Sequence, residues 1–223
     1  MQCKENQLLA AFKKSILVLG IISSIGILGY GLSYIIKMPA VSPDGFVPKT
    51  LGNNSSSTFG FGNLLALFIL MYAFAFVPVN IMFTIKKYRT NPYALIIASS
   101  LITISLIVEI INNLPLFAAG LFPGKLESVS PDVQLYLRQV ETIKYLAFDV
   151  VGFAFAYLAF FIYALVFFKS DKVMSYTIIG SIVTFIANIP FLWFAPNGAV
   201  VLMVISVFAF ALVPIYLARM AVK

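Results

Sequence analysis

Six apolar segments, separated by shorter polar stretches, follow one another along the chain. They cover residues 15–36, 63–84, 92–120, 146–168, 173–194 and 199–217. A helix needs about 20 apolar residues to cross the ~30 Å hydrocarbon core of a bilayer. A secretory signal peptide has a shorter apolar core of about 7–15 residues, so the first segment is interpreted as a retained helix. The pattern predicts an all-α membrane protein, with residues 1–223 forming a single bundle of six transmembrane helices.

The polar stretch before the fourth apolar segment contains a helix start. Ser130 offers a capping hydroxyl, Pro131 suits the first helical position, and Asp132 adds an acid in the first turn. No residue after Pro131 breaks the helix before Phe168. A helix of about 38 residues would be ~57 Å long, so its first three turns should stand outside the bilayer. Residues 37–62 and 121–145 are therefore predicted as extracytoplasmic loops, the second partly helical, and residues 196–198 as a tight reversal.

The distribution of basic residues predicts the orientation. Ten of the 15 Lys and Arg residues lie in the N-terminal segment, in residues 86–89, in residues 169–172 and at the C-terminus, and the other five lie on the opposite side. Basic residues favour the cytoplasmic side. We therefore expect a multi-pass protein of the cell membrane with both termini in the cytoplasm. Asn53 and Asn54 each begin an N-x-S sequon, and they are glycosylation candidates in an extracytoplasmic loop.

Composition excludes several classes of function. The chain is 61% hydrophobic and 10% charged, with a net charge of +7, whereas soluble domains carry about 25% charged residues. Because the basic residues are short clusters between apolar runs, they indicate topology and not nucleic-acid binding. Cys3 is the single cysteine and there is no histidine, so an internal disulfide and the usual His-based metal, haem and catalytic sites are excluded. We expect no cofactor, no metal and no enzymatic activity.

Two windows of the sequence resemble each other. Residues 107–117 and 182–192 align without a gap and share an Asn-x-Pro, at Asn113 and Pro115 in the first and at Asn188 and Pro190 in the second. Extended backwards, the match pairs the second and third helices with the fourth and fifth as a parallel repeat, unlike the inverted repeats common in transporters. Pro115, Pro190 and Pro78 each remove a backbone donor. They are predicted to kink their helices, and the two repeated prolines either shape packing or form a hinge or ion site.

Two carboxylates fall inside the predicted spans. Glu109 lies past the middle of the third helix and Asp149 before the middle of the fourth, so the antiparallel helices place both in the outer half of the membrane. An acid at the bilayer centre costs about 2.5–3.5 kcal/mol on insertion scales, and it normally faces the bundle. Either acid could carry a proton, bind a cation, share a proton with the other, or fix the packing. The candidate intramembrane polar site comprises Glu109, Asn112, Asn113, Asp149 and Asn188.

Three functions from different classes fit this inventory. The first is a non-enzymatic structural or accessory subunit of a larger membrane assembly, which explains the shortage of catalytic residues. The second is a small cation- or proton-coupled transporter or channel that uses Glu109 and Asp149. The third, a membrane enzyme acting on lipid, has few residues to support it, because the many Ser and Thr residues have no His beside them as a base. Expected partners are the lipid bilayer and other membrane subunits or a second copy, and not nucleic acid.

Overall fold

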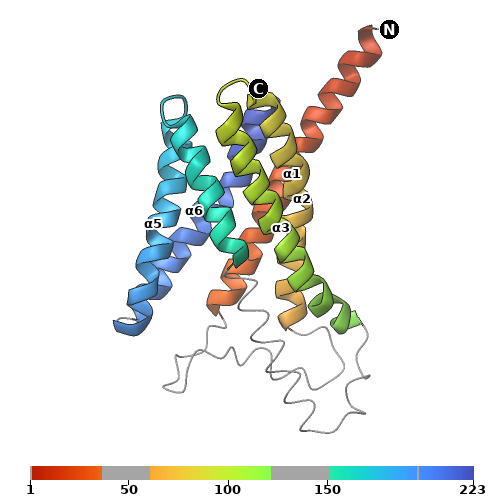
Figure 1. Ribbon diagram of the computed structural model, residues 1–223. Helices are drawn as coiled ribbons and strands as arrows, with labels where there is room; N and C mark the ends of the chain where they lie inside the picture. Colours follow the sequence, from red (N-terminus) through yellow and green to blue (C-terminus); the bar gives the residue numbers. More distant parts are fainter. Residues whose placement is uncertain (1, 37–60, 122–150, 195) are drawn as a thin grey trace.

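The computed structural model describes residues 2–36, 61–121, 151–194 and 196–223, which form helices and the two short turns that join some of them (Figure 1). The predicted loops, the extension of the fourth helix before residue 151 and Asp149 lie outside the described residues. The helices are α1 (Gln2–Ile36), α2 (Phe61–Lys87), α3 (Pro92–Leu121), a helix over Val151–Phe167, α5 (Lys172–Phe194) and α6 (Pro196–Val222).

Among the residues that the structure describes, four helices are long and apolar enough to cross a membrane. The qualifying segments are Ala10–Leu32, Ala66–Lys87, Pro92–Leu114 and Val204–Val222. Two further apolar helical segments, Val151–Phe167 and Lys172–Ala187, lie within the described residues. The architecture is therefore that of an all-helical membrane protein, and six crossings remain a prediction.

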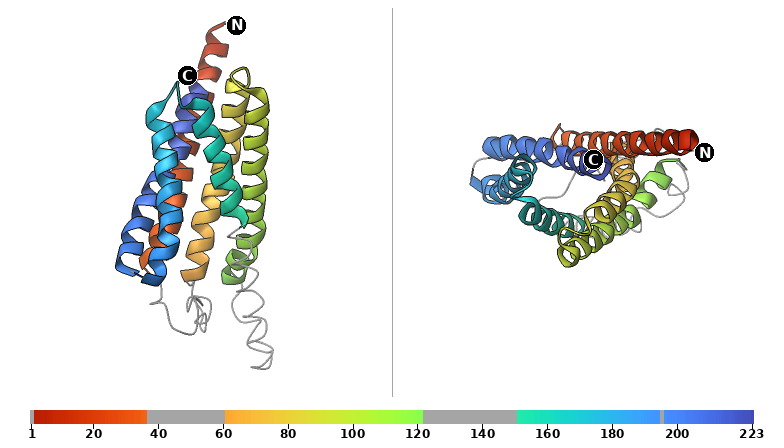
Figure 2. Two further views of the ribbon diagram at one scale, coloured as in Figure 1. Left: turned by 60° about the vertical axis from the view of Figure 1, so that its left-hand side comes forward. Right: turned by 90° about the horizontal axis from the view of Figure 1, so that it is seen from above.

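The helices form a ring, which Figure 2 shows from above. Helix α1 packs between α2 and α6, α2 also contacts α3, and α5 packs against α6. The 151–167 helix closes the ring: its Tyr163 packs edge-on against Phe83 of α2, and its Tyr157 stacks on Phe185 of α5. Buried aromatic and aliphatic side chains fill the core of the ring.

Glycines allow α1 to lie close to both neighbours. A Cβ placed on Gly26 would be 2.6 Å from the carbonyl oxygen of Phe68 and from the amide nitrogen of Tyr72 in α2. A Cβ placed on Gly20 would be 2.6 Å from the Cβ of Ala218 in α6. Small residues of this kind let helix backbones approach each other where lipid supplies no hydrophobic driving force.

The two described turns between helices are built in the same way. In the turn between α2 and α3, Asn91 accepts a hydrogen bond on Oδ1 from the amide of Ala94 at 3.3 Å. In the turn before α5, Asp171 accepts one from the amide of Met174 at 3.0 Å. Each is an N-cap that satisfies a free amide at the start of its helix. Both turns lie at the same end of the bundle (Figure 1).

These caps change the comparison of the two hairpins. Asn91 and Asp171 are 80 positions apart, whereas Asn113 and Asn188 are 75 apart. Counted from the capping residue of each helix, the first Asn-x-Pro motif therefore lies five residues, or about 7.5 Å, farther along its helix than the second. The repeat remains a prediction, and an alignment of the whole hairpins needs a gap.

The helix bounds correct the sequence prediction at two places. Residues 196–198 are not a separate reversal, because α6 begins at Pro196, and proline is tolerated in the first turn of a helix. Helix α1 begins at Gln2 and not near Ser15, and its first turns extend past the end of the bundle (Figure 1).

Helices α2 and α6 continue through Pro78 and Pro214, and the backbone is also helical at Pro115 and Pro190.

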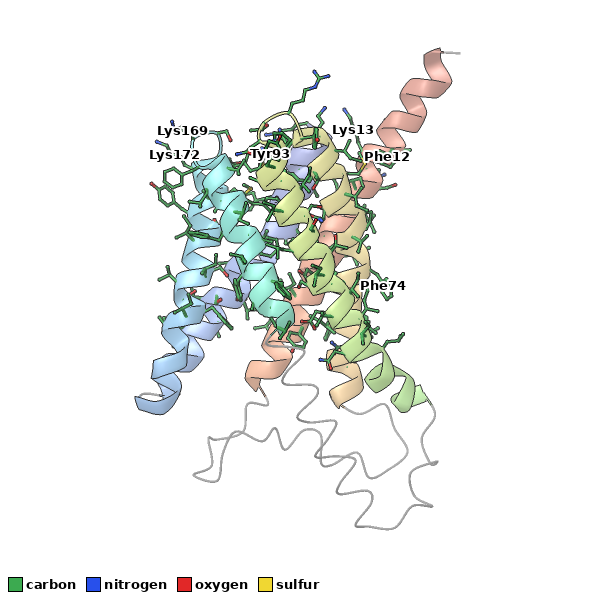
Figure 3. All side chains as sticks on the ribbon, in the orientation of Figure 1. Phe12, Lys13, Phe74, Tyr93, Lys169 and Lys172 are labelled. Carbon is green, nitrogen blue, oxygen red and sulfur yellow. The ribbon has the colours of Figure 1, made fainter. Side chains whose placement is uncertain are left out.

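The surface of the bundle separates apolar sides from a basic end. Lys13, Lys169 and Lys172 lie at the same end, as Figure 3 shows, while Phe74 points outward from the side of α2. Large apolar side chains, including Phe74, Ile104 and Val183, are exposed along the sides. In the part of the chain that the structure describes, exposed apolar sides and basic residues at a helix end are the surface expected of a protein surrounded by lipid.

Candidate functional site

Helix α3 carries a polar stripe on its inner face. Ser105, Glu109, Asn112 and Asn113 are all buried, and Glu109 is only 1% exposed. The neighbouring isoleucines Ile104, Ile107 and Ile111 are exposed on the opposite face. Residues three and four apart share one face of a helix, so the spacing along α3 directs the carboxyl group into the bundle.

Asn113 holds the Glu109 side chain in place. Its Nδ2 donates a hydrogen bond of 3.2 Å to Glu109 Oε2 and another of 2.9 Å to the backbone oxygen of Glu109. One amide group therefore binds both the carboxyl and the helix turn below it. This double contact restricts the rotamers that the carboxyl can adopt.

The backbone of the 151–167 helix covers the other carboxyl oxygen. A Cβ placed on Gly152 would overlap Glu109 Oε1 and would lie 3.1 Å from its Cδ. Only glycine leaves space for the acid at this crossing. Asp149 and the side chain of Asn188 are outside the described residues, so their place in the same polar site as Glu109 remains a prediction.

Two tyrosines that the sequence did not single out extend the polar region. Tyr72 of α2 is 1% exposed, and its hydroxyl interacts electrostatically with Glu109 and with Tyr157. The Tyr157 hydroxyl lies 3.4 Å from Ser206 Oγ, and Ser206 Oγ donates to the backbone oxygen of Ser181 at 3.0 Å. Polar groups therefore cross the bundle from α3, past α2 and the 151–167 helix, to α5 and α6.

A signal for Tyr72 was present in the sequence. Tyrosine in membrane proteins is expected at the two interfaces, where its ring and hydroxyl meet lipid and water. Tyr72 instead lies near the middle of the second apolar segment. A tyrosine at that depth needs a partner inside the protein, and its depth alone singles it out.

A second polar cluster lies nearer to the turns and contains no charge. Tyr163 donates a hydrogen bond of 2.8 Å to Asn80 Oδ1. Asn80 Nδ2 donates at 3.0 Å to Ser99 Oγ. The cluster ties α2, α3 and the 151–167 helix together through side chains that satisfy one another.

An apolar groove lies away from both clusters. It has a volume of about 460 Å³ between α1 and α2, and its lining residues include Leu19, Leu67, Phe74 and Leu114. Its walls are aliphatic and aromatic, which suits a lipid chain and offers no polar chemistry. The chemistry of the described bundle is therefore concentrated around Glu109.

The residues around Glu109 limit what that site can do. A carboxyl, an amide and a phenol supply oxygen ligands and exchangeable protons. Among the described residues, no group of three His, Cys, Asp or Glu side chains is placed to hold a metal ion. The arrangement suits a proton, a small cation or a structural hydrogen-bond network.

No protein-family model, curated protein or solved structure matches this chain.

Proposed function

We propose that the chain is a non-enzymatic integral membrane protein that serves as a structural subunit of a larger membrane assembly. In this proposal its six helices cross the membrane and both termini lie in the cytoplasm. The observation that supports it best is that polar side chains inside the bundle bind helix to helix. Tyr163, Asn80 and Ser99 join three helices, and Ser181 and Ser206 join α5 to α6.

Such bonds stabilise a fixed arrangement of helices. Model peptides and mutant cycles in membranes assign about 0.6–2 kcal/mol to each interhelical hydrogen bond. Ser175 Oγ adds another, donating at 2.9 Å to the backbone oxygen of Ala164 in the 151–167 helix. A bundle fixed in this way presents constant outer faces, which a permanent neighbour requires. The extension of α1 past the basic end offers a further surface for contact.

Extraction of native membranes in mild detergent tests this proposal. We expect the chain to migrate in native mass spectrometry with other membrane subunits, or with a second copy, in fixed stoichiometry. A chain that remains a monomer in native membranes and in nanodiscs contradicts the proposal.

Cysteine cross-linking locates the contact. Ile104 is exposed on α3, whereas its neighbour Ile102 is buried. If α3 faces a partner, Ile104→Cys cross-links to it, and the matched control Ile102→Cys does not. Equal yields at both positions show random collision and argue against a specific interface on this helix.

A second candidate, a cation- or proton-coupled transporter, is favoured by one observation. Glu109 is buried where α3 meets the 151–167 helix, and Tyr72 of α2 interacts with it. Charged residues within membranes often belong to ion or proton pathways. Purified protein in liposomes should then move protons or sodium ions, and Glu109→Gln should abolish the flux while the protein still inserts. Liposomes with no flux above the protein-free background exclude this function for those ions.

A further inference from the structure

Two buried polar atoms, one on α2 and one on α3, lack a hydrogen-bond partner within the described part of the chain. They are the hydroxyl of Tyr72 and the Oδ1 of Asn113. Both residues are at most 1% exposed, so bulk water does not satisfy them. Buried polar groups are nearly always paired, and an exception indicates an unseen ligand, an ion or a functional role.

The Asn113 oxygen is held next to the carboxyl of Glu109. Asn113 lies one helical turn after Glu109, on the same face of α3. Its Nδ2 is fixed by the bonds to Glu109 Oε2 and to the Glu109 backbone oxygen. Since Oδ1 belongs to the same planar amide, its position is fixed by the same two bonds.

The Tyr72 hydroxyl reaches the same level from α2. Asn80 and Ser99 are hydrogen-bonded and set the register of the two antiparallel helices. Tyr72 precedes Asn80 by eight residues in α2, and Glu109 follows Ser99 by ten residues in α3. Along the helix axes, the two residues therefore lie about 12 and about 15 Å from the Asn80–Ser99 pair, in the same direction. Side chains on a helix lean towards its N-terminus, and in α2 this direction carries the Tyr72 hydroxyl towards Glu109. Their electrostatic interaction is consistent with this placement.

The chemistry and size of this cluster define its ligand. Its three groups are oxygen donors: one carboxyl, one amide oxygen and one phenol oxygen. A single carboxylate balances one positive charge, whereas a divalent ion would leave excess charge buried in a low-dielectric interior. Gly152 brings helix backbone against Glu109 and leaves little space, so the ligand must be small.

We propose that Glu109, Asn113 and Tyr72 bind one univalent cation, either a proton or a sodium ion, inside the bundle. A proton on Glu109 supplies a hydrogen-bond donor for Asn113 Oδ1 or for the tyrosine oxygen. A sodium ion takes lone pairs from the three oxygens, the ligands that hard cations prefer. A sodium ion pairs both atoms that the described protein leaves without a partner, and a proton pairs one of them.

The ionisable surroundings of this site are simple in the described part of the chain. Tyr72 of α2 interacts electrostatically with Glu109 and with Tyr157 of the 151–167 helix. Glu109 is the acid among these groups, so it is the group expected to exchange the cation. Binding here is independent of whether the chain belongs to a larger assembly or transports an ion.

The test measures cation binding to the full-length protein in nanodiscs. Thermal stability is recorded while sodium chloride replaces choline chloride at constant ionic strength, and again across a pH series without sodium. Infrared difference spectra over the same pH series report protonation of a carboxyl group. A sodium site gives a saturable rise in Tm with sodium. A proton site gives a carboxyl band that appears as the pH falls, with no sodium response.

Variants test whether the sodium or proton response arises at Glu109, Asn113 and Tyr72. Glu109→Gln should remove the response. Tyr72→Phe should shift the cation concentration at its midpoint about tenfold or more, the effect of losing one hydrogen bond to a charged group. Asp171→Asn, which keeps a capping side chain on a surface turn, is the matched control and should leave the response unchanged. If Glu109→Gln does not fold, Tyr72→Phe alone decides, because it retains the acid. A wild-type protein with neither response, or a midpoint unchanged in Tyr72→Phe, overturns the proposal.

Discussion

Replacing Gly152 with alanine tests the contact that positions the carboxyl group of Glu109. The added Cβ would overlap Glu109 Oε1, and Asn113 restrains the acid from moving aside. Either the 151–167 helix moves away from α3 or the carboxyl gives up its bond to Asn113. Both changes should lower the free energy of unfolding.

The size of this effect follows from a comparison with Gly180. A Cβ at Gly180 in α5 meets nothing within 4 Å, so Gly180→Ala should only gain the helix preference of alanine, about 0.5–1 kcal/mol. Gly152→Ala has the same gain, but overpacking of a filled interior costs about 1–3 kcal/mol. The difference between the two variants isolates the overlap, and we expect Gly152→Ala to be the less stable by about 1–3 kcal/mol.

A double-mutant cycle then identifies the residue involved. In a Glu109→Ala background the overlapping oxygen is absent, so Gly152→Ala should become as mild as Gly180→Ala. Reversible unfolding in mixed micelles, followed by circular dichroism, gives the four free energies of the cycle. A coupling near zero, or a wild-type-like Gly152→Ala, would refute the packing of Glu109 against Gly152.

Three further substitutions test other parts of the bundle by the same unfolding assay. Tyr163→Phe leaves Asn80 Oδ1 without its donor and should cost about 0.6–2 kcal/mol, whereas Tyr93→Phe, at a side chain 81% exposed, should cost nothing. Gly26→Ala forces a Cβ against the backbone of α2, which cannot rotate away, so a loss at or above the upper end of about 1–3 kcal/mol is expected. Asp171→Ala removes the cap of α5 and should cost about 1 kcal/mol. A stability equal to wild type in any of these variants, Tyr93→Phe excepted, contradicts the contact concerned.

Local signals made parts of the fold predictable. The third apolar segment was expected over residues 92–120, and α3 covers Pro92–Leu121. Its start is local, because Asn91 caps the helix and proline suits the first helical position. The start of α1 was missed because it was sought in the apolar pattern alone. Residues 2–14 contain neither proline nor glycine and consist largely of good helix formers, so the helix extends beyond the apolar segment.

The part of the site that lies on one helix was predictable from the sequence. The contacts that depend on how two helices pack against each other were not. The spacing of Ser105, Glu109, Asn112 and Asn113 along the sequence is compatible with one face of a helix, because helical periodicity is a local property. The approach of Tyr72 to Glu109 depends on the register between α2 and α3, which Asn80 and Ser99 set through a tertiary contact. A single sequence does not encode that register in any local pattern.

Accessibility of single cysteines tests the central claim that the chain crosses the membrane with its basic end in the cytoplasm. In a variant without Cys3, cysteines replace Asn54 and Ser128 in the predicted outer loops, and Tyr88 and Ser170 in the two turns at the basic end. A membrane-impermeant maleimide applied to intact cells should label the first pair, and should label the second pair only after the membrane is opened. Labelling of residue 88 or 170 in intact cells, with residues 54 and 128 protected, would contradict the topology.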